Sequence, residues 1–327
     1  MNILKRICIG VLAIVAVIFI LSLRTIPSHI EYGVSFSKLH SDELGLDWKA
    51  TYLAILNDLK VKRLRLSAHW PMVEPEAGVF HFSELDFQMR EAAAHNAKVI
   101  LAVGRKTPGW PECHTPDWAA SFSEEKEHAA RLEYITAVVN RYKNSPALDM
   151  WQVENEPFLN YARTICGQPD EGFFADEIAL VKKIDSKHKI LVTDGGEFGT
   201  WYKARSYGDV FGSTMYLYVY SSHIGYWRYP IGGWFFRAKQ NLFDLFTRKP
   251  SISIEVGAEP WLNTAIAGTS IDEQLQHMNM DRFGDILSVA QTSGFAEHYL
   301  WGAEWWYYMT KHGHSEFWNS AKELFGH

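Results

Sequence analysis

Eight short apolar runs, each separated from the next by amphipathic sequence, restrict the possible folds of this chain more than any other feature. They lie at residues 31–37, 61–67, 98–104, 148–153, 190–194, 210–216, 251–256 and 296–301. Each run has the length of a strand, and the segments between them include helical spacing. Strands that alternate with helices form a parallel sheet, and eight of them close most economically into a (β/α)8 barrel. We therefore predict an α/β fold of the TIM-barrel type.

Two of the intervening helices are predicted clearly, over residues 124–142 and 271–291. Each follows a capping box, in which a serine precedes a glutamate by three residues. The boxes are Ser121 with Glu124 and Ser270 with Glu273.

Length and charge limit the organisation and the partners. A chain of 327 residues with 47% hydrophobic residues fits one barrel, which we place at residues 30–327. The formal net charge is -6, and no basic run follows the N-terminus. This balance argues against a nucleic-acid partner and favours a neutral or weakly anionic substrate.

The N-terminus resembles a targeting element. Lys5 and Arg6 precede the uncharged apolar stretch 7–23, which Arg24 closes. The charges would keep the first residues cytoplasmic, and the stretch is near the lower limit for crossing a bilayer. We predict an uncleaved transmembrane signal anchor with a short linker at residues 1–29, so that the barrel is membrane-anchored and extracytoplasmic. Cleavage of a signal peptide, which would give a secreted protein, is the alternative.

Export affects how the cysteines are interpreted. Cys8 falls in the anchor, whereas Cys113 and Cys166 both follow apolar strands. In an oxidising compartment these two form either a disulfide or two unrelated buried thiols. No Cys-x-x-Cys or His-x-x-x-His spacing predicts a metal site, and we predict no cofactor.

Polar residues concentrate where the predicted strands end, which in this fold is where chemistry occurs. The motifs are Arg65 on the second strand, Asn155-Glu156-Pro157 after the fourth, Glu255-Val256-Gly257 on the seventh and Trp301 on the eighth. A further block, Trp70…Glu74-Pro75…Gly78-Val-Phe-His-Phe…Leu85-Asp86, follows the second strand. In this order the motifs resemble the clan A glycoside hydrolases, retaining enzymes with cellulase-like and β-galactosidase-like branches. The resemblance covers nearly the whole chain from about residue 31.

The resemblance implies a retaining hydrolase of a β-linked oligo- or polysaccharide. Glu156 would be the acid/base and Glu255 the nucleophile. Their strands are three βα units apart, so both carboxyl groups can face one mouth, and retention needs them about 5 to 5.5 Å apart. Arg65 would supply the positive charge beside the nucleophile.

Other roles follow from the same resemblance. Asn155 would donate to the sugar 2-hydroxyl, and Trp301 would form a platform under the sugar ring. Tyr216 would hydrogen-bond the nucleophile, with Tyr220 as an alternative, although Thr214 stands where many relatives have histidine.

Several positions keep two interpretations. His69 and Trp70 either contact substrate or pack the barrel rim, and Glu304 is either a substrate contact or an anchor. Glu154 competes with Glu156, and only the motif favours Glu156. Glu259 competes with Glu255, which is favoured because Glu259 lies beyond the glycine and would belong to a supporting loop. The aromatic segment 216–236 is a lid packed on the barrel, a glycan-binding wall or a membrane-facing patch.

Two other functions compete with the retaining hydrolase. A non-catalytic carbohydrate-binding or envelope-associated barrel would keep the cleft without turnover. A metal-dependent hydrolase barrel would need His-x-His after the first strand, where this chain has Val34-Ser-Phe-Ser.

Overall fold

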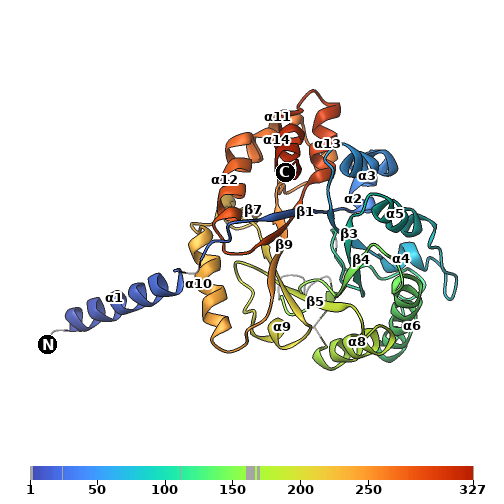
Figure 1. The fold of residues 1–327 in the computed structure, drawn as a ribbon, viewed down its shortest axis with the longest axis horizontal. Coiled ribbons are helices and arrows are strands. Elements are labelled where there is room, and N and C mark those ends of the chain that lie inside the picture. The colour runs from blue at the N-terminus through green and yellow to red at the C-terminus, as the bar shows by residue number, and fades with distance from the viewer. Residues whose placement is uncertain (1–2, 24, 111, 160–165, 168–169, 327) are drawn as a thin grey trace.

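Eight parallel strands close into a barrel in the computed structural model, which describes residues 3–23, 25–110, 112–159, 166–167 and 170–326 (Figure 1). Around the barrel the strands follow the order β1-β10-β9-β6-β5-β4-β3-β2. They are β1 (Glu31–Ser35), β2 (Arg63–Ser67), β3 (Lys98–Val103), β4 (Leu148–Val153), β5 (Lys189–Asp194), β6 (Val210–Met215), β9 (Ser251–Gly257) and β10 (Glu297–Trp301). The prediction of a (β/α)8 barrel is confirmed.

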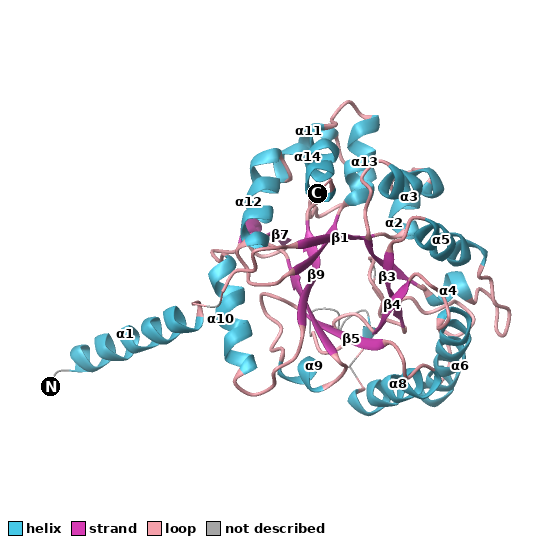
Figure 2. Cartoon of the chain, in the orientation of Figure 1, coloured by secondary structure: helices cyan, strands magenta, loops and turns pink. Residues whose placement is uncertain are grey.

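Helices surround these strands, as Figure 2 shows. They are α2 (Lys38–Glu43), α3 (Trp48–Asn57), α4 (Trp70–Val73), α5 (Ser83–Ala94), α6 (Glu124–Tyr142), α8 (Glu171–Ile184), α9 (Tyr202–Ser206), α10 (Gly233–Asp244), the 3-10 helix η2 (Ile266–Gly268), α11 (Ile271–His277), α12 (Met280–Gln291), α13 (Ala303–Lys311) and α14 (Glu316–Phe325). A small antiparallel hairpin, β7 (Tyr218–Ser221) with β8 (Gly225–Arg228), follows β6.

Alternation along the strands divides the apolar side chains into two cores. In β3, Val99, Leu101 and Val103 belong to the large cluster that also includes helix residues, whereas Ile100 belongs to a smaller cluster formed mainly by strand residues. Successive strand residues point to opposite faces, so one strand can supply both clusters. The near-continuous apolar runs of the sequence result from burial on both faces of the sheet.

The predicted helix over 271–291 is wrong in one respect, because it is broken into α11 and α12. Asn279 caps the second helix, accepting a hydrogen bond from the backbone N–H of Arg282 at 3.0 Å. An asparagine side chain that satisfies a free N–H stabilises a new helix start, which the periodicity on either side conceals.

The two capping boxes have different outcomes. Ser270 accepts from the N–H of Glu273 at 3.3 Å, as predicted. At α6 the residue before the helix is Ser123 rather than Ser121, and its side chain makes no capping hydrogen bond.

The N-terminal helix α1 (Ile3–Leu21) projects from the barrel next to α10 (Figure 1). At its base Arg237 donates to the backbone oxygen of Ser22 at 2.8 Å, and Asn241 to that of Leu21 at 2.6 Å. Within the described residues, no helix combines the length and the apolar character that crossing a bilayer requires. The predicted transmembrane helix is therefore not supported, and Arg24, which closes the predicted anchor, lies outside the described residues.

A buried ion cluster joins α6, α8 and the end of β4. Arg131 lies 3.0 Å from Glu127, 3.2 Å from Glu154 and 3.3 Å from Glu177. All four residues are buried. One guanidinium thus contacts three acidic groups, and burial together with the charge of Glu154 raises the pKa of Glu177 well above its usual value. Removal of the arginine would leave buried acidic groups without their cation.

Substitution of Arg131 by alanine is therefore expected to lower the free energy of unfolding by about 3–5 kcal/mol. Urea denaturation at neutral pH measures the loss. Arg141→Ala is the matched control, because Arg141 pairs with Asp86 at the surface and should cost about 1 kcal/mol or less. Equal losses in the two variants would contradict the role assigned to the buried cluster.

Candidate functional site

Polar side chains gather at the carboxyl ends of the barrel strands. They are Arg65 in β2, Asn155 and Glu156 directly after β4, Tyr216 directly after β6, Glu255 in β9 and Trp301 at the end of β10. Parallel strands bring these ends to one rim of the barrel, where (β/α)8 enzymes carry their active sites. The structure therefore brings together residues that the sequence spreads over more than two thirds of the chain.

Arg65 is the central cation of this group and is almost fully buried. Its Nη1 forms an ion pair with the carboxylate of Glu255. Its Nε donates to the Gln152 side chain at 2.8 Å, and its Nη2 donates to Oδ1 of Asn155 at 2.7 Å. The rigid planar fork of the guanidinium thus orients three side chains from β4 and β9 at once.

Tyr216 contacts Glu255 from the other side. Its hydroxyl donates to Oε1 of Glu255, and burial, together with the charge of Glu255, raises the pKa of Tyr216 well above its usual value. The phenol therefore remains a hydrogen-bond donor. A Cβ added at Gly257 would overlap the Tyr216 ring. The glycine of the Glu-x-Gly motif is what allows the tyrosine to lie this close to the strand.

Backbone conformation separates Glu154 from Glu156. Both have positive φ, 57° and 44°, which breaks the strand alternation after Val153. Glu154 turns to the loop after β3, where it accepts from the N–H of Arg105 at 2.7 Å. Glu156 instead accepts from the Thr214 hydroxyl at 2.9 Å. Thr214 is the register partner of Glu255 on the neighbouring strand, so Glu156 points toward Glu255 and Glu154 does not.

The Glu156 carboxyl group is suited to hold a proton. Burial, the charge of Glu112 and that of Glu255 raise its pKa to about 8, against the opposing charge of Lys106. A carboxyl group with a pKa near neutrality can serve as an acid at the pH of most cellular compartments.

Trp301 is oriented by Glu259, whose carboxylate accepts a hydrogen bond from the Trp301 indole N–H at 2.7 Å. The other oxygen of Glu259 lies 2.9 Å from Nε2 of His40. The charge of Glu259 raises the pKa of His40 well above its usual value, although burial alone would lower it. Glu259 is thus engaged in orienting Trp301, which remains partly exposed.

Trp70 and His69, for which the sequence allowed either substrate contact or packing of the rim, are both buried against other residues. Trp70 is fully buried; its indole N–H donates to Glu74 at 2.8 Å, and its ring packs on Trp118 and Tyr134. His69 is 3% exposed and lies 2.8 Å from the backbone oxygen of Pro108. Burial lowers the pKa of His69 to about 3. Both residues therefore pack the rim of the barrel.

Glu304, for which the sequence allowed a substrate contact or an anchor, has the contacts of an anchor. It is 1% exposed, and its carboxyl group accepts from the backbone N–H of Ser37, the N-cap residue of α2. Burial raises the pKa of Glu304 to about 7. The side chain joins α13 to the start of α2.

The aromatic segment 216–236 forms the β7–β8 hairpin and the start of α10. Arg228 pairs with Asp285 of α12 at 2.7 Å, and the Tyr226 ring stacks on His277 of α11 with centroids 3.5 Å apart. The hairpin therefore packs against neighbouring helices. These contacts favour the interpretation of a lid packed on the barrel.

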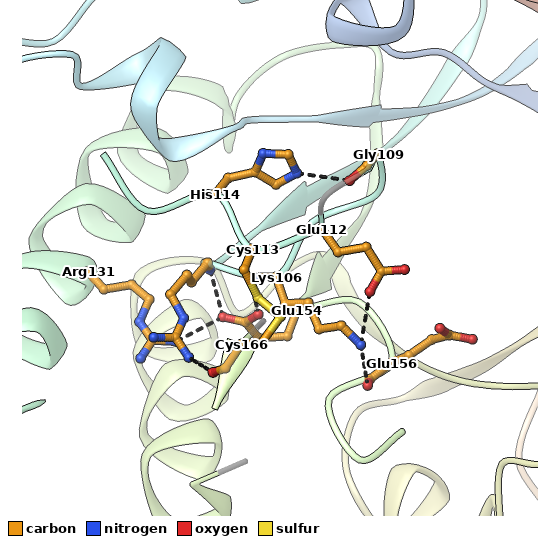
Figure 3. The surroundings of a disulfide bond; sticks show 10 residues. Lys106, Gly109, Glu112, Cys113, His114, Arg131, Glu154, Glu156 and Cys166 are labelled. Atoms are coloured by element: carbon orange, nitrogen blue, oxygen red, sulfur yellow. Dashed lines mark hydrogen bonds and ion pairs between the residues drawn. A yellow bond between two sulfur atoms is a disulfide. The ribbon is translucent and has the colours of Figure 1, made fainter. Parts of the chain in front are cut away.

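A disulfide lies beside the site. Cys113, in the loop after β3, is bonded to Cys166, beyond the end of β4, and their Cα atoms are 5.5 Å apart (Figure 3). Between this bond and Glu156 lies Lys106, whose Nζ is 3.2 Å from Glu112 and donates to the backbone oxygen of Glu156 at 3.1 Å. The disulfide thus connects the two loops that carry Glu112 and Glu156.

Sequence reasoning missed four residues of this site. Gln152 and Thr214 orient catalytic-site side chains, and Lys106 and Glu112 place a charge pair beside Glu156. Gln152 is the penultimate residue of β4, the strand before Asn155-Glu156, so the alternation of side chains along that strand could have indicated an inward position. Glu112 belongs to no recognisable motif, and only the folded loop after β3 places it beside Lys106.

One group of side chains in the described part of the chain has the spacing to share a metal ion. It consists of Glu124, His128 and Asp170, whose ligand atoms lie within 4.8 Å of one another. These residues belong to the starts of α6 and α8, and the group includes neither Glu156 nor Glu255.

Sequence comparison links the chain to glycosidases. The family model Glyco_hydro_42, described as beta-galactosidase, matches residues 48–176. The probable mannan endo-1,4-beta-mannosidase F of Emericella nidulans is 26% identical over 208 residues, which cover 58% of this chain and 46% of the relative. The beta-galactosidase BgaB of Geobacillus sp. is 30% identical over 116 residues, 30% of this chain and 17% of that protein. The chain thus spans less than half the length of these two relatives.

Solved structures share the fold at low identity. The GH5_18 protein of Bifidobacterium longum subsp. longum matches with a TM-score of 0.59 and 14% identity over 84% of this chain and 70% of that one. Xylanase10C of Cellvibrio japonicus, in complex with xylopentaose, matches with a TM-score of 0.56 and 15% identity. The match covers 86% of this chain and 59% of the xylanase chain. The resemblance to the clan A glycoside hydrolases is confirmed. The relatives named above carry glycosidase names.

The raised pKa of Glu156 implies that the free energy of unfolding depends on pH. An acid whose pKa is higher in the folded state binds its proton more tightly when folded, so the folded protein loses stability as the pH rises from about 4.3 to about 8. Glu156→Gln removes this penalty, and the variant should exceed the parent by a few kcal/mol at pH 9 while matching it at pH 4. Thermal unfolding at the two pH values measures the difference.

The matched control for this measurement is Glu124→Gln, which alters an exposed carboxylate at the start of α6. The change that it causes at either pH should be small, because an exposed carboxylate interacts weakly with its neighbours. A Glu156→Gln difference that is the same at pH 4 and pH 9 would contradict the raised pKa.

Proposed function

We propose that this protein is a retaining glycoside hydrolase that cleaves β-linked glycans by double displacement, with Glu255 as nucleophile and Glu156 as acid/base. The observation that carries the proposal is the contrast between the two carboxyl groups. One is held by a guanidinium and a phenol, and the other is buried beside negative charge. In such enzymes a buried carboxyl group that keeps its proton serves as the acid, and a carboxylate in contact with a cation serves as the nucleophile.

Glu255 has the surroundings that a nucleophile needs. Arg65 and Tyr216 each contact one of its oxygens, so a cation and a hydrogen-bond donor lie beside the attacking group. In the first step the carboxylate attacks the anomeric carbon, the glycosidic bond breaks and a glycosyl-enzyme forms. In the second step water displaces the enzyme carboxylate and restores the anomeric configuration.

Glu156 supplies and then recovers the proton. In its neutral form, favoured by the raised pKa, it protonates the leaving oxygen of the first step. Once it is ionised, it takes a proton from the attacking water in the second step. Thr214 holds its carboxyl group toward Glu255 during both steps.

Asn155 and Trp301 would bind the sugar at the cleavage point. Oδ1 of Asn155 accepts from Arg65 and lies 3.3 Å from donors on Gln152 and Thr193. Its oxygen is occupied, so the amide nitrogen is the group that would donate to the 2-hydroxyl. The partly exposed ring of Trp301 would stack on the apolar face of the sugar.

The substrate class is inferred from the relatives. Their names specify a mannan endo-1,4-beta-mannosidase and a beta-galactosidase, and one structural neighbour holds xylopentaose. A β-linked glycan is the feature these substrates share, and we extend only that feature to this chain.

Exchange of the nucleophile tests the mechanism. Glu255→Gln keeps the shape of the side chain but cannot attack, so turnover of aryl β-glycosides should fall by a factor on the order of 10³ or more. Initial rates on a panel of aryl β-glycosides and β-linked polysaccharides measure it. Activity equal to the parent would rule out Glu255 as nucleophile, and binding without turnover by the parent would favour a non-catalytic barrel.

The same panel tests the acid. Glu156→Ala should lose about 10²–10⁴-fold on poor leaving groups and much less on dinitrophenyl glycosides, which leave without a proton. A loss that does not depend on the leaving group would contradict the acid role. Exposed Glu124→Gln serves as the control, with rates like those of the parent on every substrate.

We place the barrel outside the cytoplasm, because disulfides persist in oxidising compartments. The bond between Cys113 and Cys166 supports this location. Alkylation of intact cells before lysis, followed by mass spectrometry, should recover these two cysteines as one linked peptide pair. Recovery of both as alkylated thiols would contradict an extracytoplasmic barrel, and Cys8 serves as the internal thiol control.

A further inference from the structure

A third carboxylate, that of Glu112, stands beside the pair proposed for catalysis, and the mechanism above does not use it. Glu112 and Glu156 are joined through Lys106, whose Nζ is 3.2 Å from the Glu112 carboxylate and 3.1 Å from the backbone oxygen of Glu156. Figure 3 shows the side chains of Glu112 and Glu156 extending to the same side of this lysine. The charge of Glu255 acts on Glu112 as well. The three carboxyl groups therefore share one electrostatic environment.

The loop after β3 is built to hold Glu112 in place. Glu112 has a positive φ of 70°. Its N–H donates to the Gly109 oxygen at 2.7 Å, and its own carbonyl accepts from Thr107 at 3.1 Å. A non-glycine residue is held in this conformation only when its surroundings determine it strongly. The position of Glu112 is thus a constrained feature of the loop.

The disulfide supplies a second constraint. The residue after Glu112 is Cys113, bonded to Cys166 on the far side of the segment that carries Glu156. Arg105 donates to the Cys166 backbone oxygen at 2.6 Å, which ties the same two segments together. A covalent bond one residue from the carboxylate limits how far the loop can move away from Glu156.

The charged and titratable groups that face Glu156 come from several elements. They are Glu112 and Lys106 in the β3–α6 loop, Glu255 in β9 and Tyr216 after β6. Arg65 of β2 acts on Glu112. Burial raises the pKa of Glu112, whereas Lys106 and Arg65 favour its charged form. A negative charge next to a buried carboxyl group stabilises the protonated form of that group.

We propose that Glu112 is a positioning residue whose carboxylate, held by Lys106 and by the Cys113–Cys166 disulfide, keeps the proton on Glu156 until the leaving group takes it. This inference rests on the proposed function, since it assigns Glu156 as the acid. Glu112 acts through its charge and does not exchange a proton with the substrate.

The test is a direct titration of Glu156 in the full-length protein with carbon-13-labelled glutamate side chains. NMR spectra of the parent and of Glu156→Gln identify the Glu156 carboxyl signal. In Glu112→Gln, which keeps the shape of the side chain but removes its charge, the Glu156 pKa should fall by about one unit or more. The control Glu124→Gln should leave it unchanged. An unchanged Glu156 titration in Glu112→Gln would overturn the proposal, whether or not the protein turns over any substrate.

A double variant, Cys113→Ala with Cys166→Ala, tests the disulfide. Release of the loop should lower the Glu156 pKa in the same direction as Glu112→Gln. A titration identical to that of the parent would overturn the part assigned to the disulfide.

Kinetics separate this inference from the proposed function. With an aryl β-glycoside, the basic limb of kcat/KM reports the acid of the free enzyme, and in Glu112→Gln it should move to lower pH by the amount seen in the NMR titration. Activity lost equally at every pH would overturn the positioning role and indicate a structural one. If the parent turned over no substrate but Glu112→Gln still lowered the Glu156 pKa in the NMR titration, the hydrolase mechanism would be refuted. The electrostatic effect of Glu112 on Glu156 would stand.

Discussion

The buried guanidinium of Arg65 is the interaction on which the site depends. Removing an arginine from water is costly unless every donor finds a partner. Here the partners are Glu255, Gln152 and Asn155, supplied by strands that stand apart around the barrel. Only the closed sheet brings these acceptors to Arg65 and so offsets the cost of burying its charge. The site therefore assembles when the barrel closes.

Around this cation the described part of the site brings three acidic side chains together with two basic ones. Glu112, Glu156 and Glu255 face Arg65 and Lys106, and burial raises the pKa of both Glu112 and Glu156. Such crowding destabilises the fold and is typical of functional sites, where local rules are broken and the rest of the structure compensates. The compensation comes from a large apolar core and from paired clusters such as that of Arg131.

The strands could be predicted from the sequence because burial on both faces gives them a strong local pattern, and each observed strand lies within two residues of its prediction at either end. The break between α11 and α12 could not, since one asparagine cap interrupts a pattern that continues on both sides. The sequence likewise left two interpretations open for His69, Trp70 and Glu304. A place near a strand end does not reveal whether a side chain turns to the cleft or into the packing behind it.

The sequence by itself determined the barrel, the two motifs that carry Glu156 and Glu255, and the rim on which they lie, because hydrophobic periodicity and strand polarity are properties of local sequence. The tertiary structure decided which of two adjacent glutamates faces the other carboxylate. That choice depends on positive φ at Glu154 and Glu156 and on partners from distant segments, Arg131 for one and Thr214 for the other. The tertiary structure also revealed the place of Glu112, because Glu112 comes near Lys106 and Glu156 only when the chain folds.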